Sequence, residues 1–156
     1  MKKRNRRNGL TLIELMVTIA AASILILTVG LILIMAFRSW RVNNAFAELR
    51  RDSAFAFSMM TRDVHEASYV GLDDAGTGYL EADSEIVGNP TVTYTQNGDT
   101  LEYDDGSGGI TLIPKNVQFF DSEKQVAGDG VLLTLELTHA EFGISTTNQV
   151  FVNTRN

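Results

Sequence analysis

The sequence predicts an α+β protein in which a long N-terminal helix packs on an antiparallel β-sheet head. The first half of the helix is predicted to be transmembrane and the second half amphipathic. Three observations support this fold class: residues 10–37 are almost entirely apolar, residues 38–70 contain no proline or glycine, and residues 71–156 are rich in Gly, Asp, Ser and Thr. A helical part followed by a run of strands is typical of an α+β architecture.

The first nine residues form a basic leader. It holds five of the thirteen Lys and Arg residues and no acidic residue. The rest of the chain therefore has eight basic against nineteen acidic residues, a formal charge of −11. Because binding to phosphates requires a basic face, the head is not expected to bind nucleic acid.

Residues 10–37 are predicted to be a transmembrane helix. Glu14 is the only charged side chain among these 28 residues. A bilayer core is spanned by about 20 apolar residues that rise about 1.5 Å each, so the segment is long enough. The basic leader favours a cytoplasmic N-terminus and an extracytoplasmic head. The charge asymmetry is modest, because Arg38, Arg41, Arg50 and Arg51 follow the segment.

Two other interpretations of the apolar segment stay open. A secretory signal peptide could be cut after Ala20–Ala22, but residues 24–37 would then stay apolar beyond the cut, where a signal peptide normally ends its apolar run. The segment could also be an uncleaved signal anchor, in which Gly9 is incidental. The chain would then be a membrane-anchored monomer whose β head binds a ligand or a partner.

Glu14 is the most informative residue of the apolar segment. A carboxylate in a transmembrane helix costs roughly 2.5–3.5 kcal/mol near the bilayer centre and is usually functional. Within its own chain we expect that Glu14 cannot easily be satisfied. A free α-amine at Leu10 would be mostly charged at neutral pH, because its pKa is about 8. Between chains staggered along a bundle, such an amine could pair with Glu14 of a neighbour.

Residues 9–15, Gly-Leu-Thr-Leu-Ile-Glu-Leu, resemble the processing site of type IV prepilins and type II secretion pseudopilins. The resemblance implies that prepilin peptidase cuts between Gly9 and Leu10, that Leu10 is methylated, and that Glu14 pairs with the N-terminus of a neighbouring subunit during assembly. Leu10 departs from the family, in which Phe or Met is more usual. The implied partners are prepilin peptidase, other pilin or pseudopilin subunits, an inner-membrane assembly platform and membrane lipid.

The resemblance also implies a location and a role. The chain would be a single-pass protein of the bacterial inner membrane that later joins a pilus or pseudopilus as a structural subunit. Residues 60–67 resemble the end of this helix in PilW-like or pseudopilin J-like minor subunits. Many major pilins carry a C-terminal cysteine pair, and its absence here favours a minor pilin or pseudopilin. Many pilins also have a proline within the apolar segment, whereas this chain has only Gly30 as a weak point, with a helix penalty of about 1 kcal/mol.

Residues 38–70 are predicted to continue the helix, which would then run from Leu10 to about Val70. Mostly apolar side chains recur here at spacings of three and four, and they fall within about 80° of arc, as on the core-facing side of a helix. His65 falls on the polar flank. The apolar stripe comprises Val42, Phe46, Leu49, Ser53, Phe57, Met60, Val64 and Ala67.

Residues 71–156 are predicted to form the β-rich head. Residues 73–78 are expected to be a loop, and residues 91–95 and 100–103 flank an Asn-Gly turn that indicates a hairpin. A two-residue loop would pair Tyr94 with Leu101 and Val92 with Tyr103. Further strands are expected at residues 110–113, 117–120, 131–138 and 145–152. Residues 131–138 alternate between apolar and polar, as in an antiparallel sheet covered on one side by the helix stripe.

The sequence offers little material for catalysis. It contains no cysteine, and its two histidines, His65 and His139, lie far apart. No nucleophile elbow, P-loop or zinc-protease motif occurs, so no catalytic residue and no cofactor is predicted, and an anchored enzyme is the least favoured class. Calcium is the one cofactor considered, at Asp104–Gly109. The ligand spacing there matches no fixed pattern, which favours a solvated acidic turn.

Overall fold

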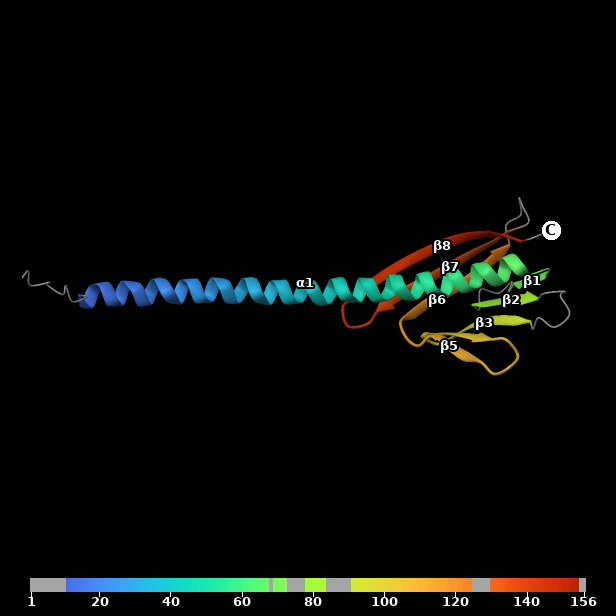
Figure 1. The fold of residues 1–156 in the computed structure, drawn as a ribbon, viewed down its shortest axis with the longest axis horizontal. Helices are drawn as coiled ribbons and strands as arrows, with labels where there is room; N and C mark the ends of the chain where they lie inside the picture. Colours follow the sequence, from blue (N-terminus) through green and yellow to red (C-terminus); the bar gives the residue numbers. More distant parts are fainter. Residues whose placement is uncertain (1–10, 68, 73–77, 84–90, 125–129, 155–156) are drawn as a thin grey trace, which may run out of the picture. The chain divides into compact units, whose positions relative to one another are not determined.

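The computed structural model describes residues 11–67, 69–72, 78–83, 91–124 and 130–154. They form one helix followed by eight strands. Figure 1 shows strands packed beside the last part of this helix. Contacts divide the chain into two units, residues 1–42 and 43–156, which are described separately below. The elements are α1 (Leu12–Glu66), β1 (Tyr69–Leu72), β2 (Tyr79–Asp83), β3 (Val92–Asn97), β4 (Thr100–Asp104), β5 (Ile110–Ile113), β6 (Val117–Lys124), β7 (Gly130–His139) and β8 (Ile144–Asn153).

The part of α1 that lies in the first unit is apolar on all sides and uncovered. Its large side chains are exposed, including Leu12 at 79% and Ile26 at 72%. Among the described residues, α1 is the one helix that is long and apolar enough to cross a membrane. The predicted apolar helix is therefore confirmed, and its surface requires lipid or other helices as a cover.

α1 ends at Glu66, four residues before the predicted end at Val70. Val70 instead lies in β1, opposite Ala82 of the antiparallel neighbour β2. Residues 38–70 contain no proline or glycine, so no local signal marks this end. Pairing with β2, ten residues further along the chain, satisfies the backbone of residues 69–72 in place of a last helical turn.

The second half of α1 buries the predicted stripe, which is therefore confirmed. Residues 43–66 turn one side to the head and leave the other side exposed. Val42 and Phe46, at the start of the stripe, are only partly buried. The buried members of the helix are Ala45, Leu49, Ser53, Ala56, Phe57, Met60 and Val64, and Ala67 is buried directly after it.

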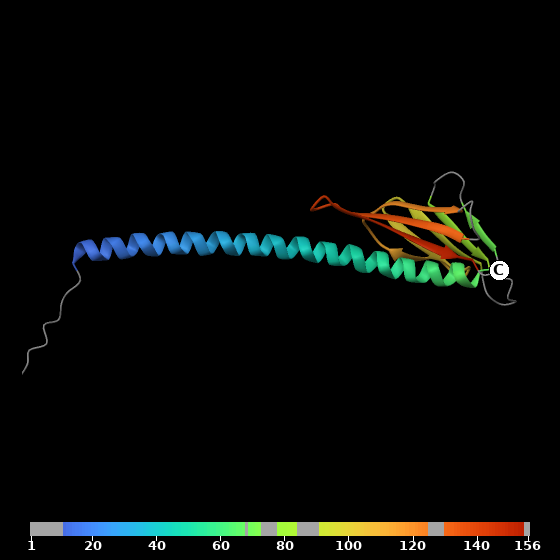
Figure 2. The same cartoon turned by 90° about the horizontal axis from the view of Figure 1, so that it is seen from above.

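Two antiparallel sheets cover this side of α1, in the orders β1-β2-β3-β4-β5 and β6-β7-β8. Figure 2 shows their strands gathered beside the last part of the helix. One core unites Met60 of α1 with Tyr94 of the first sheet and Leu135 of the second. In β7 the buried and half-buried side chains alternate, which confirms the one-sided strand predicted for residues 131–138.

The predicted hairpin exists, but its turn is displaced by one residue. β3 runs through Asn97, which pairs with Thr100, so the two loop residues are Gly98 and Asp99. Gly98 adopts φ +63°. A type II′ turn requires a positive φ at its first central position, where glycine is strongly favoured. Because Gly98 takes that position, the residue before it, Asn97, is the last residue of the strand.

The predicted hairpin register is consequently wrong by two residues. Tyr94 faces Tyr103 and not Leu101, and Thr93 faces Asp104. A shift of two residues preserves the side to which each side chain points, because the strand period is two. Tyr94 and Leu101 are therefore both fully buried on the core face, as the sequence pattern predicts.

Candidate functional site

The predicted assembly acid lies at the N-terminal end of α1. Glu14 is in the first turn, and its side chain is exposed. Gly9 and Leu10, between which cleavage is predicted, lie outside the described residues. The geometry of the site therefore begins at Thr11.

Thr11 and Glu14 form a capping box. The backbone N–H of Thr11 donates to Oε2 of Glu14 at 2.9 Å, and the Thr11 hydroxyl donates to the same oxygen at 3.0 Å. In return the N–H of Glu14 donates to Oγ1 of Thr11 at 3.3 Å. Thr11 directly precedes the helix, so it is the N-cap residue and Glu14 stands at the third helical position, where a glutamate reaches back to the cap.

The expectation that Glu14 is not easily satisfied within its own chain is therefore wrong. The reason is local: the N-cap amide and hydroxyl lie within reach of a carboxylate three residues later. The Thr-x-x-Glu pattern was present in the sequence and is a known signal of a helix start. Among the described residues, every hydrogen bond to the Glu14 side chain reaches Oε2, so Oε1 is available to a further donor such as an amine.

A shallow apolar groove marks the far end of the uncovered part of α1. Its volume is about 350 Å³, and it is lined by Leu33, Ala36, Phe37 and Trp40. These positions repeat at helical spacing, so the small Ala36 lies between larger neighbours on one side of the helix. A notch of this kind accommodates a lipid chain or a side chain of another helix.

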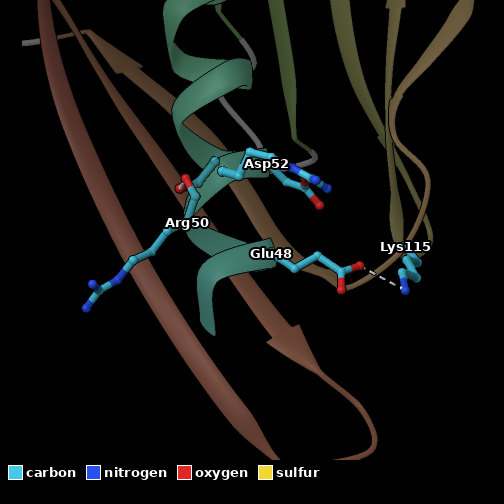
Figure 3. Close-up of polar contacts among 6 residues, drawn as sticks. Glu48, Arg50, Asp52 and Lys115 are labelled. Carbon is cyan, nitrogen blue, oxygen red and sulfur yellow. Dashed lines mark hydrogen bonds and ion pairs between the residues drawn. The ribbon is translucent and has the colours of Figure 1, made fainter. Parts of the chain in front are cut away.

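In the second unit, polar contacts join the head to α1. Figure 3 shows the Glu48 side chain reaching from α1 to Lys115, and the two groups form an ion pair of 3.0 Å. The hydrogen bond from Lys115 lowers the pKa of Glu48, while burial acts in the opposite direction. Arg50 points away from this pair. A second contact lies deeper, where the Tyr94 hydroxyl donates to Oδ2 of Asp63 at 2.5 Å.

Among the described residues, no group of three or more His, Cys, Asp or Glu residues could hold a metal ion. His65 is exposed on the helix, in agreement with its predicted place on the polar flank. In the acidic turn, Asp104 accepts a hydrogen bond from the N–H of Gly106, and Asp105 accepts bonds from Ser107. These carboxylates thus serve their own loop, and the solvated acidic turn without calcium stays a prediction.

Comparison with known proteins identifies the N-terminal part of the chain. Residues 4–36 match the prokaryotic N-terminal methylation motif. This match indicates a type IV pilin-like or pseudopilin-like signal for prepilin peptidase, joined to a membrane-anchoring apolar helix. No curated protein and no solved structure matches the chain. The matched segment contains Gly9, Leu10 and Glu14 and carries no information about a subfamily.

Proposed function

We propose that this chain is a structural subunit of a type IV pilus or a type II secretion pseudopilus. In this role it is cut after Gly9 by prepilin peptidase, methylated at Leu10 and assembled through α1. The observation that carries the proposal is the methylation motif at residues 4–36, joined to a helix whose apolar side chains are uncovered. The exposed Glu14 in the first turn of that helix supplies the assembly acid.

Two environments in succession would cover the apolar part of α1. Before assembly it lies in the inner membrane, with the N-terminus in the cytoplasm and the head outside. After assembly it lies among the helices of other pilin or pseudopilin subunits, delivered through an inner-membrane assembly platform. Cleavage favours the second state, because an intact leader would keep five cations at the end of an apolar helix that must leave the membrane.

Cleavage would also complete the site at Glu14. It converts the Leu10 amide into a free amine, which is charged at neutral pH. An amine of a neighbouring subunit can approach Oε1 while Oε2 stays in the capping box. The capping box and an intermolecular ion pair are therefore compatible uses of one carboxylate.

Within this role, the absence of a cysteine pair favours a minor pilin or pseudopilin. The resemblance of residues 60–67 to PilW-like and pseudopilin J-like subunits points the same way. The number of copies per fibre would test this finer assignment, and quantitative immunoblotting of purified fibres measures it.

The cleavage step is tested by size. Full-length chain and a Gly9→Val variant are expressed with and without prepilin peptidase, and their electrophoretic mobility is compared. The unaltered chain should lose nine residues only when the peptidase is present, and Gly9→Val should keep them. An unaltered chain that retains its leader beside an active peptidase would reject the proposal and favour the signal-anchor alternative.

The assembly step is tested at Glu14. A Glu14→Ala variant should be cleaved normally but should be recovered poorly in the sheared fibre fraction. Ser23→Ala is a matched control, because the Ser23 hydroxyl is also exposed within the apolar helix and bonds only to the carbonyl of Ile19 among the described residues. Normal assembly of Glu14→Ala would remove the role given to this acid.

A further inference from the structure

The outer face of the five-stranded sheet carries acidic side chains without any local cation. Side chains of β2 and β4 alternate, so the carboxylates point away from the core that buries Leu80 and Leu101. Between residues 66 and 114 the sequence holds ten Asp or Glu residues and no Lys, Arg or His. We call this surface the acidic face, and its described carboxylates are those of Glu81, Asp83, Glu102 and Asp104. Each of them also accepts a hydrogen bond from a nearby residue of the head, which leaves further acceptor positions on each carboxylate.

The register of the strands fixes how these carboxylates are spread. Glu81 and Asp104 both pair with Thr93 of the intervening β3, and Glu102 pairs with Thr95. With strands about 4.8 Å apart, Glu81 and Asp104 lie about 10 Å apart at their Cα atoms. Among the described residues no group of three or more acidic or histidine side chains could hold a metal ion. A spread of this size suits a partner whose positive charges are themselves spread out.

The exposed side of α1 in the same unit presents a complementary surface. Arg51, Phe55, Ser58 and Arg62 follow one another at spacings of four, three and four, so they share one side of the helix. This side is opposite the buried residues, and we call it the arginine stripe. The exposed fractions of the Arg51 and Arg62 side chains are 77% and 57%. Phe55 between them is 54% exposed.

The arginines of the stripe keep most of their bonding capacity. Each makes an ion pair with the aspartate that follows it, Arg51 with Asp52 at 3.1 Å and Arg62 with Asp63 at 2.8 Å. A guanidinium carries five N–H donors, so it can bind a second carboxylate as well. The Arg51 side chain is largely exposed, so its pair with Asp52 contributes little by itself. The Asp63 side chain is only 9% exposed, so Arg62 keeps its Nε bond to Asp63 and offers its remaining N–H donors to a partner.

The dimensions of the two surfaces match. Arg51 and Arg62 are eleven residues apart, which is about 16 Å along a helix. On the acidic face, Asp83 and Glu102 are separated by two strand spacings across the sheet and by two same-facing positions along the strands. The resulting diagonal between their Cα atoms is also about 16 Å. Between them lie the short side chains of Thr93 and Thr95, on which the ring of Phe55 can pack beside Tyr79, the neighbour of Thr95 in β2.

We propose that the acidic face of one subunit docks on the arginine stripe of a second copy of this chain. This inference rests on the proposed function, since it describes how neighbouring heads meet in a fibre. The two surfaces lie on opposite sides of the second unit, one on the outer face of the sheet and one on the uncovered side of α1. A contact between two different surfaces of identical chains is heterologous and leaves both ends open, as a filament requires.

Disulfide trapping tests the contact directly, because the chain has no cysteine of its own. Two full-length chains with different tags, one carrying Phe55→Cys and the other Thr95→Cys, are co-expressed with prepilin peptidase and the assembly machinery, then oxidised. A disulfide-linked pair of the two chains is expected. The matched control replaces Thr95→Cys by Thr147→Cys, an exposed position on β8 of the other sheet, and should give no linked pair.

Charge reversal distinguishes docking from random collision. In R51E/R62E chains carrying Phe55→Cys, the linked product should fall about fivefold or more, because two favourable pairs become repulsive. Adding D83R/E102R to the Thr95→Cys chain should restore it, which also shows that both variants fold. Equal linkage to Thr95→Cys and Thr147→Cys, or no recovery on charge exchange, would overturn the inference.

The same cells separate this inference from the proposed function. Leader removal and the Glu14-dependent recovery of fibres are measured alongside the linked product. If both occur and no Phe55–Thr95 link forms, the heads meet differently, or copies of this chain are never adjacent, and only the docking contact is rejected. If the leader is retained, the proposed function itself fails.

Discussion

The hydroxyl of Tyr94, at the centre of the five-stranded sheet, donates a hydrogen bond of 2.5 Å to the carboxylate of Asp63 on α1. The bond joins residues 31 positions apart and ties the sheet to the helix that it covers. Asp63 also accepts from Nε of Arg62 at 2.8 Å, so its charge is compensated at the edge of the core. Burial raises the pKa of Tyr94, and the bond to Asp63 raises it further, so this phenol stays a donor throughout the physiological range.

Tyr94→Phe should therefore destabilise the head. The variant keeps the ring but removes a hydrogen bond to a charged group, at a cost of about 1.5–3 kcal/mol in the free energy of unfolding. Tyr103→Phe is the control, because its ring packs edge-on against Tyr94 at 5.3 Å and the ring contact is retained. Pulse proteolysis of the full chain in detergent over a urea series measures both. Equal losses in the two variants would contradict the special role of Tyr94.

The ion pair between Glu48 and Lys115 predicts a pH dependence. The pKa of Glu48 is lowered in the folded chain, mainly by the hydrogen bond from Lys115. The pair therefore stabilises the fold above the ordinary glutamate pKa of 4.5, and this contribution is lost as the pH falls through the lower folded pKa. Because both side chains are partly exposed, the contribution is small, about 0.5 kcal/mol. Unfolding of the full chain at pH values on both sides of this range measures the effect. Glu48→Gln should remove the pH dependence. Glu66→Gln is the control, since Glu66 has no ion-pair partner among the described residues, and it should retain the dependence.

Gly78 predicts a steric effect that Gly98 does not share. Both have positive φ, +74° and +63°. A Cβ at Gly78 would lie 2.8 Å from Cβ of Gln96, whereas a Cβ at Gly98 would meet nothing within 4 Å. Gly98→Ala should cost about 1–2 kcal/mol for the left-handed backbone alone, and Gly78→Ala about 1–3 kcal/mol more for the clash. The urea midpoints of the two variants give the difference in the free energy of unfolding. Equal midpoints would show that residues of the β2–β3 region shift without cost to accommodate the added methyl group.

The capping box at Thr11 makes the role of the Glu14 charge separable from its role as a cap. Glu14→Gln keeps a side chain that can close a capping box, but it removes the charge. Thr11→Ala keeps the charge but removes the cap hydroxyl. If pairing with a neighbour's amine drives assembly, fibre recovery should fall for Glu14→Gln and be largely retained for Thr11→Ala. The reverse order would assign the importance of this acid to helix capping.

Much of the candidate site could be predicted because its signals are local. The apolar run, the spacing between Gly9 and Glu14, and the stripe of α1 depend only on neighbouring residues and on the helical period. The capping box is equally local, because Thr-x-x-Glu signals it within four residues. The sequence-based prediction nevertheless assigns Glu14 a partner in another chain, on the ground of the membrane cost of its charge. The acidic face was less visible, because it depends on which strands are neighbours.

The elements that could not be predicted depend on distant partners. β1 and β2 carry weak strand patterns, and the segment between them was expected to be a loop that begins at Asp73; residues 73–77 lie outside the described residues. The end of α1 at Glu66 follows from the pairing of these two strands. The hairpin register differs from the predicted one by two residues. The reason is that Gly98, which has a positive φ, is the first loop residue, so that Asn97 belongs to the strand.

The order and periodicity of nearby side chains are sufficient to predict a basic leader, an apolar helix with one acid that becomes one-sided beyond Phe37, and a β-rich head. Contacts between distant parts of the chain set the end of α1, the division of the eight described strands into two sheets, and the bond from Tyr94 to Asp63. The same contacts place carboxylates of β2 and β4 on one face. Strand pairing and core packing select these arrangements, because their free energy comes from contacts between residues far apart in the chain.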